Sequence, residues 1–128
     1  MQALSAAAIS RISHFAPQEI SGLAWACATL GFADGPLMAA ISAASIATIT
    51  SDFDARGIGS LAWAFAALGV EDPPLLDAIA AASIPKISQF NAQDIGNTAW
   101  AFAHLARPHG PLMAALAAAS IRPISDLA

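Results

Sequence analysis

The sequence predicts an all-α protein, an α-solenoid of stacked helix pairs with a 37–38-residue repeat. The first observation is a recurring frame in which Trp25, Trp63 and Trp100, each between two alanines, are 38 and 37 residues apart. The second is composition, because 57% of the 128 residues are hydrophobic and only 11% are charged. Average proteins carry about 25% charged residues, so most helix faces here are expected to pack against a neighbour.

The repeat divides the chain into a half unit and three full units. A phenylalanine precedes each tryptophan by ten residues, a proline follows it by eleven and a serine by twenty. We therefore assign one helical-repeat domain over residues 1–128, with a half repeat at 1–14 and repeats at 15–52, 53–89 and 90–126. Neither end has the polar face of a terminal repeat, so we interpret the chain as a segment of a longer array. Its open ends are expected to self-associate or to join further repeats.

Each repeat is predicted to begin with one helix. These helices are expected over residues 17–30, 55–68 and 92–105. Asp54 and Asn91 stand where an N-cap acceptor is needed, and Asp94 follows Asn91 by three residues, as in a capping box. Gly31 and Gly69 suit the left-handed position that follows a helix end.

A second helix is predicted to follow in each repeat. It begins at Pro36, Pro74 or Pro111, because the missing N–H of proline has no partner in the first turn anyway. It ends near a Ser-Ile pair, where Pro85 and Pro123 disfavour the helical conformation of the preceding residue. The Ile-x-x-Ile-x-x-Phe segment that comes next is expected to form another helical turn.

The first helix of each repeat is predicted to be apolar on nearly every side. One stripe should bury against the second helix of its own repeat. In the first repeat this stripe consists of Ile20, Leu23, Ala24, Cys27 and Leu30. The tryptophans lie beside the opposite, polar side of the helix and are flanked by small residues. We assign them to inter-repeat packing and expect each to plug the seam between neighbouring repeats.

A polar strip lies on the opposite side of these helices. Its residues differ between repeats, while the frame around them stays constant. They are the candidate ligand-facing residues of the chain: Gln18, Arg56, Ser60, Gln93, Asn97 and His104.

No enzymatic activity is predicted. The three histidines fall at three different repeat positions, and none has a carboxylate or thiol partner at a recognisable spacing. His109 takes the place that Asp34 holds before a helix. Cys27 takes the place of Phe65 and is interpreted as a core residue. We therefore expect no catalytic residue, no bound metal and no cofactor.

Charge and hydropathy argue against two further classes of protein, strong polyanion binders and membrane proteins. The net charge is −4 and the five basic residues are not clustered, so this chain alone is not expected to hold polyanions strongly. No apolar run reaches the roughly 20 residues of a membrane span, so no membrane association is predicted. The first residues show no targeting peptide, since they lack the basic character of a signal or transit sequence.

The frame Phe-x-x-Gln-x-Ile-x-x-x-Ala-Trp-Ala-Phe-Ala-x-Leu-Gly resembles the octotricopeptide repeat. These helical repeats occur in organellar gene-expression factors. They are related to the arrays of FAST-kinase-domain and RAP-domain proteins and of RNA-editing substrate-binding complexes. The resemblance covers essentially the whole chain. Its most telling matches are Phe90, Gln93, Asp94, Ile95, Asn97, Ala99 and Trp100.

The resemblance implies a function. It implies that the chain binds single-stranded RNA in a mitochondrion or chloroplast and acts in RNA processing, stability or translation, with the polar strip facing the RNA. A protein–protein interaction scaffold is the alternative, because few charges and an alanine-lined surface suit protein partners. The two hypotheses differ in salt response, since phosphate contacts weaken as salt rises and apolar contacts do not.

Overall fold

The computed structural model describes residues 2–105 and 109–127, and within them the chain is all-helical, without a strand. This confirms the predicted all-α class. The α-helices are α1 (Gln2–Arg11), α2 (Pro17–Leu30), α3 (Gly35–Thr48), α4 (Ala55–Ala67), α5 (Pro73–Ser83), α6 (Ala92–His104) and α7 (Gly110–Leu127). Two short 3-10 helices, η1 (Ile12–His14) and η2 (Ile87–Gln89), lead into α2 and α6 and confirm the expected extra helical turn. Residues 49–52 form turns at the corresponding place before α4.

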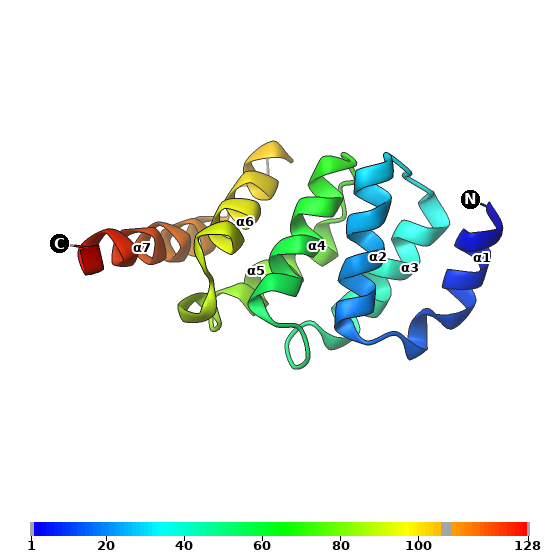
Figure 1. Ribbon diagram of the computed structural model, residues 1–128, viewed down its shortest axis with the longest axis horizontal. Coiled ribbons are helices and arrows are strands. Elements are labelled where there is room, and N and C mark those ends of the chain that lie inside the picture. The colour runs from blue at the N-terminus through cyan, green and yellow to red at the C-terminus, as the bar shows by residue number, and fades with distance from the viewer. Residues whose placement is uncertain (1, 106–108, 128) are drawn as a thin grey trace.

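The helices form an elongated row with the two termini at opposite ends (Figure 1). Helices α2, α4 and α6 lie side by side, and their contacts, α2 with α4 and α4 with α6, are the most extensive in the molecule. We call these three the first helices. The second helices α1, α3, α5 and α7 contact one another in chain order, and each of α3, α5 and α7 also contacts the first helix that precedes it.

The starts of α4 and α6 are fixed by the predicted caps. The Oδ1 atom of Asp54 accepts a hydrogen bond from the Gly57 N–H at 2.8 Å. The Oδ1 atom of Asn91 accepts from the Asp94 N–H at 2.8 Å, and Asp94 Oδ2 accepts from the Asn91 N–H at 3.1 Å. The capping box is therefore confirmed.

The second helices start one residue before the predicted prolines. Asp34, Asp72 and His109 precede α3, α5 and α7, and each accepts a hydrogen bond from the backbone N–H three residues further on. The distances are 3.0, 3.1 and 3.1 Å, the last of them to His109 Nδ1. His109 thus replaces a carboxylate as the cap, as its position in the repeat predicts.

Two helices are followed by a left-handed glycine, as predicted. Gly31 and Gly69 have φ angles of 67° and 68°, in the left-handed region where a side chain is disfavoured. The third-repeat equivalent of these glycines, Ala106, lies outside the described residues. Helix α5 ends at Ser83, before Pro85, as predicted.

The predicted end of the last helix is wrong. Helix α7 continues through Pro123 to Leu127 instead of ending near Ile121. After α3 and α5 the chain turns so that Phe53 and Phe90 become buried beneath the next first helix. Pro123 disfavours the helical conformation of the residue before it without excluding it, so this proline does not by itself end α7.

The core is one continuous apolar cluster that runs the length of the row. Ile20, Ala24 and Cys27 are buried as predicted, and Leu23 is half-buried. Leu30 is 68% exposed, so its predicted burial is wrong, because none of the described helices covers the side chain at this end of α2. None of the helices described is both long and apolar enough to span a membrane.

Candidate functional site

A groove of about 1300 Å³ crosses the N-terminal halves of α2, α4 and α6. Five of the six candidate ligand-facing residues line it. Gln18 comes from α2, Arg56 and Ser60 come from α4, and Gln93 and Asn97 come from α6. The packing of the first helices thus brings side chains from three repeat units to one surface, which we call the polar groove.

The sixth candidate, His104, does not line the polar groove. It is the last residue of α6 and stacks on Trp100, with ring centroids 4.6 Å apart and planes 16° from parallel. His104 follows Asn97 by seven residues, which is about two helical turns or roughly 10 Å along the axis. It shares the face of Asn97 but lies beyond the groove.

The tryptophans do not plug the seams between the first helices. Trp25 and Trp100 are 52% and 43% exposed, and Trp63 is half-buried. At Gly59 the helices approach closely, since a Cβ atom added to this residue of α4 would lie 3.5 Å from the backbone oxygen of Asp94 in α6. Full burial in a seam is therefore wrong for Trp25 and Trp100, whereas Trp63 packs against the core. Trp25 and Trp63 instead line the polar groove.

Several further residues of the polar groove were missed by the sequence prediction. They lie where the first helices begin, and the caps among them were identified only as structural residues. Their position next to the polar strip was the signal that could have found them. They are Ser21, Gly22, Asp52, Asp54, Asn91 and Asp94.

The electrostatics of the polar groove are mixed. Arg56 is the one cation among its lining residues, against the carboxylates of Asp52, Asp54 and Asp94. The N-termini of three parallel helices also meet here, and each carries a partial positive charge. Asp54 and Asp94 already accept hydrogen bonds from those N-termini. The groove therefore offers hydrogen-bond donors and acceptors in similar measure, with little excess positive charge.

Cys27 lies outside the polar groove and belongs to the core, as predicted. Burial, with a smaller contribution from the negative charge of Asp34, raises the pKa of its thiol above the ordinary value of 9.0. A protonated, buried thiol is a poor nucleophile and a poor metal ligand. Among the residues that the structure describes, no three His, Cys, Asp or Glu side chains gather where they could hold a metal ion.

Fold and groove together define a class of protein: an all-helical protein whose adjacent first helices present one continuous polar surface. The family of the RNA-editing substrate-binding complex 6 protein matches residues 1–127, and the chain belongs to this family. No curated protein matches the chain. The match confirms the relation to RNA-editing complex proteins that the tryptophan frame indicated.

Proposed function

We propose that this chain binds single-stranded RNA in the polar groove, as part of an organellar RNA-editing complex. The observation that carries the proposal is that five polar side chains from three repeats line one groove together with two tryptophans. The family name, RNA-editing substrate-binding complex 6 protein, supports RNA and protein partners. The same kinship supports a mitochondrial location, with a chloroplast as the other organelle that the sequence resemblance implies.

The architecture we propose is an α-solenoid of octotricopeptide type with a 37–38-residue repeat. Support comes from the packing, because α2 meets α4 as α4 meets α6. Further support comes from the helix starts, because Asp34, Asp72 and His109 cap the second helices at the same repeat position. Each unit in such an array contacts only its neighbours, which keeps the first helices parallel along the groove.

RNA recognition in this groove relies on bases more than on phosphates. The indoles of Trp25 and Trp63 offer flat apolar surfaces on which bases can stack, a contact worth about 1–3 kcal/mol per base. The side-chain amides of Gln93 and Asn97 each carry both a donor and an acceptor, which matches the edges of unpaired bases. Paired bases hide those edges, so single strands are favoured over duplexes.

The charges of the polar groove determine how the bound RNA strand is oriented. Three carboxylates on the groove surface repel phosphates, and Arg56 is the one lining residue that can pair with one. We therefore place the bases toward the groove and the phosphates toward solvent. For the same reason the affinity depends weakly on salt, with a slope of log K against log salt of about −0.7, the value for one phosphate contact.

The proposed action is binding and not catalysis. Two of the three histidines and Cys27 have structural roles, since His109 caps α7, His104 stacks on Trp100 and Cys27 is buried in the core. No acid–base pair or nucleophile is needed for the proposed role. No cofactor is proposed.

A fluorescence anisotropy titration with a labelled single-stranded RNA tests the proposal. Wild-type protein should bind the single strand more tightly than the duplex of the same sequence. Arg56→Gln and Asn97→Ala should each weaken binding by about three- to tenfold, as expected for the loss of one hydrogen-bonded contact. Arg11→Gln removes the same charge outside the polar groove and should have no effect. Equal losses in Arg56→Gln and Arg11→Gln, or no RNA binding at low salt, would refute the proposal.

A protein scaffold remains the second candidate, and one observation favours it. The net charge of −4 and the carboxylates in the polar groove suit a partner with basic or amide side chains. Such a partner would occupy the same surface, and single-stranded RNA would fail to displace it if the groove serves protein and not RNA. Competition in the anisotropy assay therefore separates the two functions.

A further inference from the structure

The turn between α3 and α4 carries a serine, Ser51, on the surface of the molecule. Residues 50–52 are all exposed and lie in this turn. Lys86 holds the base of the turn, because its Nζ atom donates hydrogen bonds to the backbone oxygens of Phe53 at 2.6 Å and Ile49 at 3.5 Å. The segment between α3 and α4 loops out from the row of helices (Figure 1). Ser51 is therefore accessible to another protein on an anchored turn.

The hydroxyl group of Ser51 is held only weakly within the protein. Its Oγ atom donates to the backbone oxygen of Thr48 at 3.4 Å, which is long for a hydroxyl hydrogen bond. Ser45 in α3 and Ser83 in α5, by contrast, are buried and donate to the carbonyl four residues back at 2.7 and 2.6 Å. The hydroxyl of Ser51 can thus leave its partner and react, whereas the buried helix serines cannot.

Acidic side chains follow Ser51 closely in the chain. Asp52 and Asp54 come one and three residues after it, and both are exposed. The Oδ1 atom of Asp54 caps α4 by accepting from the Gly57 N–H, and its side chain still reaches solvent. Residues 35–50, on the other side of the serine, carry no charge. The charge pattern around this hydroxyl is therefore negative and lies on its C-terminal side.

The same serine recurs in the other repeats without the acidic residues. Ser13 and Ser88 lie, like Ser51, two residues before a repeat phenylalanine, and both are exposed. The residues one and three positions after Ser88 are neutral amides, and those after Ser13 are histidine and alanine. The amide of Asn91 caps its helix as the carboxylate does in the repeat before. Capping therefore does not by itself require the negative charge that follows Ser51.

We propose that Ser51 is a phosphorylation site for a serine/threonine kinase that selects acidic residues after the acceptor serine. Such an enzyme recognises its substrate by charge, since basic side chains beside its active site pair with the substrate carboxylates. The Oγ atom of Ser51 forms a bond to the γ-phosphorus of ATP, and the bond from that phosphorus to the bridging oxygen of ADP breaks. The hydroxyl proton passes to the catalytic carboxylate of the kinase, and ADP leaves.

The phosphate stands at the edge of the polar groove. Asp52 and Asp54, which flank this edge of the turn, line that groove together with Arg56. A phosphoserine carries about −1.5 to −2 charges at neutral pH, so it repels RNA phosphates and attracts Arg56. Phosphorylation should therefore weaken RNA binding by about two- to fivefold, as expected for an exposed charge interaction. This effect rests on the proposed RNA function, whereas the modification itself does not.

Treatment of the whole chain with casein kinase 2, an acid-directed kinase, and ATP tests the modification, with the phosphate located by peptide mass spectrometry. Wild-type protein should be phosphorylated on Ser51, and Ser51→Ala should not. Asp52→Asn and Asp54→Asn should each slow the reaction by about tenfold. Asparagine is also a good N-cap, so Asp54→Asn keeps the start of α4. Ser13 and Ser88 should stay unmodified and are matched controls within the same molecule.

Two results would overturn the phosphorylation site. One is a Ser51 that stays unmodified under conditions in which the kinase modifies an acidic reference peptide. The other is equal modification of Ser13, Ser51 and Ser88, because the acidic residues would then have no role in recognition.

Fluorescence anisotropy with a labelled single-stranded RNA tests the effect of the phosphate. Phosphorylated protein should bind more weakly than untreated protein, and kinase-treated Ser51→Ala should bind as untreated protein does. Equal affinity of the phosphorylated and untreated proteins would overturn the effect on RNA binding. Untreated protein that binds no RNA would refute the proposed RNA function, while mass spectrometry alone decides whether Ser51 is phosphorylated.

Discussion

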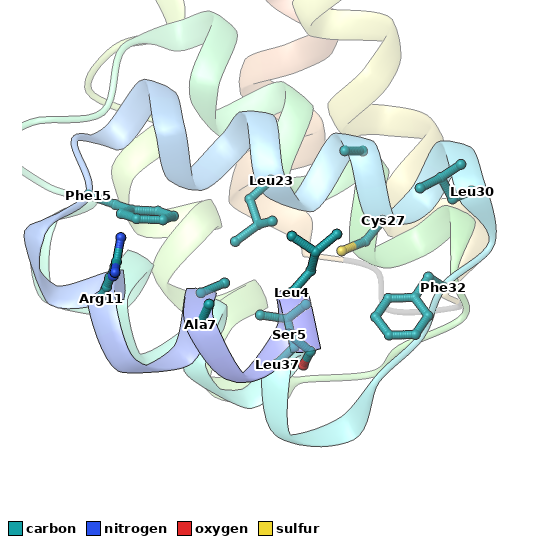
Figure 2. Close-up of a pocket in the computed structure, with 12 residues that line it drawn as sticks. Leu4, Ser5, Ala7, Arg11, Phe15, Leu23, Cys27, Leu30, Phe32 and Leu37 are labelled. Carbon is teal, nitrogen blue, oxygen red and sulfur yellow. The ribbon is translucent and has the colours of Figure 1, made fainter. Parts of the chain in front are cut away.

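Cys27 in α2 occupies the repeat position that Phe65 occupies in α4, and both side chains are buried, at 4% and 1% exposure. The smaller residue faces a mostly apolar groove of about 410 Å³ between α1 and α2, which we call the apolar groove (Figure 2), whereas the phenyl ring of Phe65 is packed among core residues. The shorter side chain at this repeat position therefore leaves space beside the core of the first repeat, between α1 and α2.

Cys27→Phe should raise the free energy of unfolding by about 0.5–2 kcal/mol, as cavity-filling changes commonly do. The ring would enter the space between α1 and α2 that the apolar groove provides. Phe65→Ala should lower the free energy of unfolding by about 3–5 kcal/mol, because it leaves a cavity in the core. Urea unfolding followed by circular dichroism measures both. A destabilised Cys27→Phe protein would mean that α1 packs more closely on α2 than the structure shows.

The thiol of Cys27 predicts how stability depends on pH. Burial and the charge of Asp34 raise its pKa in the folded protein above 9.0, so folding favours the protonated thiol. Its contribution to the free energy of unfolding is fully present below pH 9.0 and is lost as pH rises through the folded pKa. Wild type should therefore lose stability above pH 9.0 faster than Cys27→Ala does. Parallel pH curves for the two proteins would contradict this assignment.

The close packing of α4 on α6 predicts that substitutions at two glycines change the free energy of unfolding in opposite directions. Gly96→Ala should raise the free energy of unfolding by about 0.5–1 kcal/mol, because the site is open and alanine favours helix. Gly59→Leu should lower it by about 1–3 kcal/mol, because the side chain would force α6 away from α4. Thermal unfolding at low protein concentration compares them, with Gly96→Leu as the size-matched control. Similar losses for both leucine variants would contradict the packing described.

The capping box at the start of α6 predicts a local effect. Asn91→Ala should lower the free energy of unfolding by about 1 kcal/mol, because the N–H of Asp94 loses its acceptor. Gln93→Ala, an exposed change in the same first turn, should have little effect on stability. Urea unfolding of the two single variants provides the test. A Gln93→Ala loss as large as that of Asn91→Ala would show that the cap does not hold this helix.

Much of the fold was predictable because its signals are local. Proline, cap residues and glycine set the helix ends by backbone chemistry, and the observed ends of α2 and α5 follow them. The end of α7 was not predictable from Pro123, because a proline disfavours the helical conformation of the preceding residue without excluding it. The predicted burial of Leu30 was also wrong. Periodicity identifies an apolar face, but it does not show whether another helix covers it.

The candidate site was partly predictable. Helical periodicity placed Gln18, Arg56 and Asn97 on one face, and parallel packing of the first helices then brought them into one groove. The tryptophans were misplaced, because position 25 and its equivalents lie at the boundary between seam and groove. The distance between helix axes decides that boundary, and periodicity alone does not give that distance. Gly59 was the relevant signal, since a glycine in the seam indicates close helix approach.

Weak salt dependence is the most distinctive expectation of the proposed RNA binding. With Arg56 as the one cation among the lining residues, the slope of log K against log salt should be about −0.7 in wild type and near zero in Arg56→Gln. Anisotropy titrations at several salt concentrations measure the slope. A slope several times steeper would show that phosphates bind along a basic surface elsewhere on the chain.

Photo-crosslinking of a 4-thiouridine-containing single-stranded RNA, followed by peptide mapping, tests the central claim most directly. The account predicts that crosslinks concentrate on Trp25, Trp63 and their neighbours in the N-terminal halves of α2, α4 and α6. Trp100, exposed but outside the polar groove, serves as the internal control for tryptophan reactivity. Crosslinks confined to the second helices, or to Trp100 at the level of Trp63, would contradict binding in the polar groove.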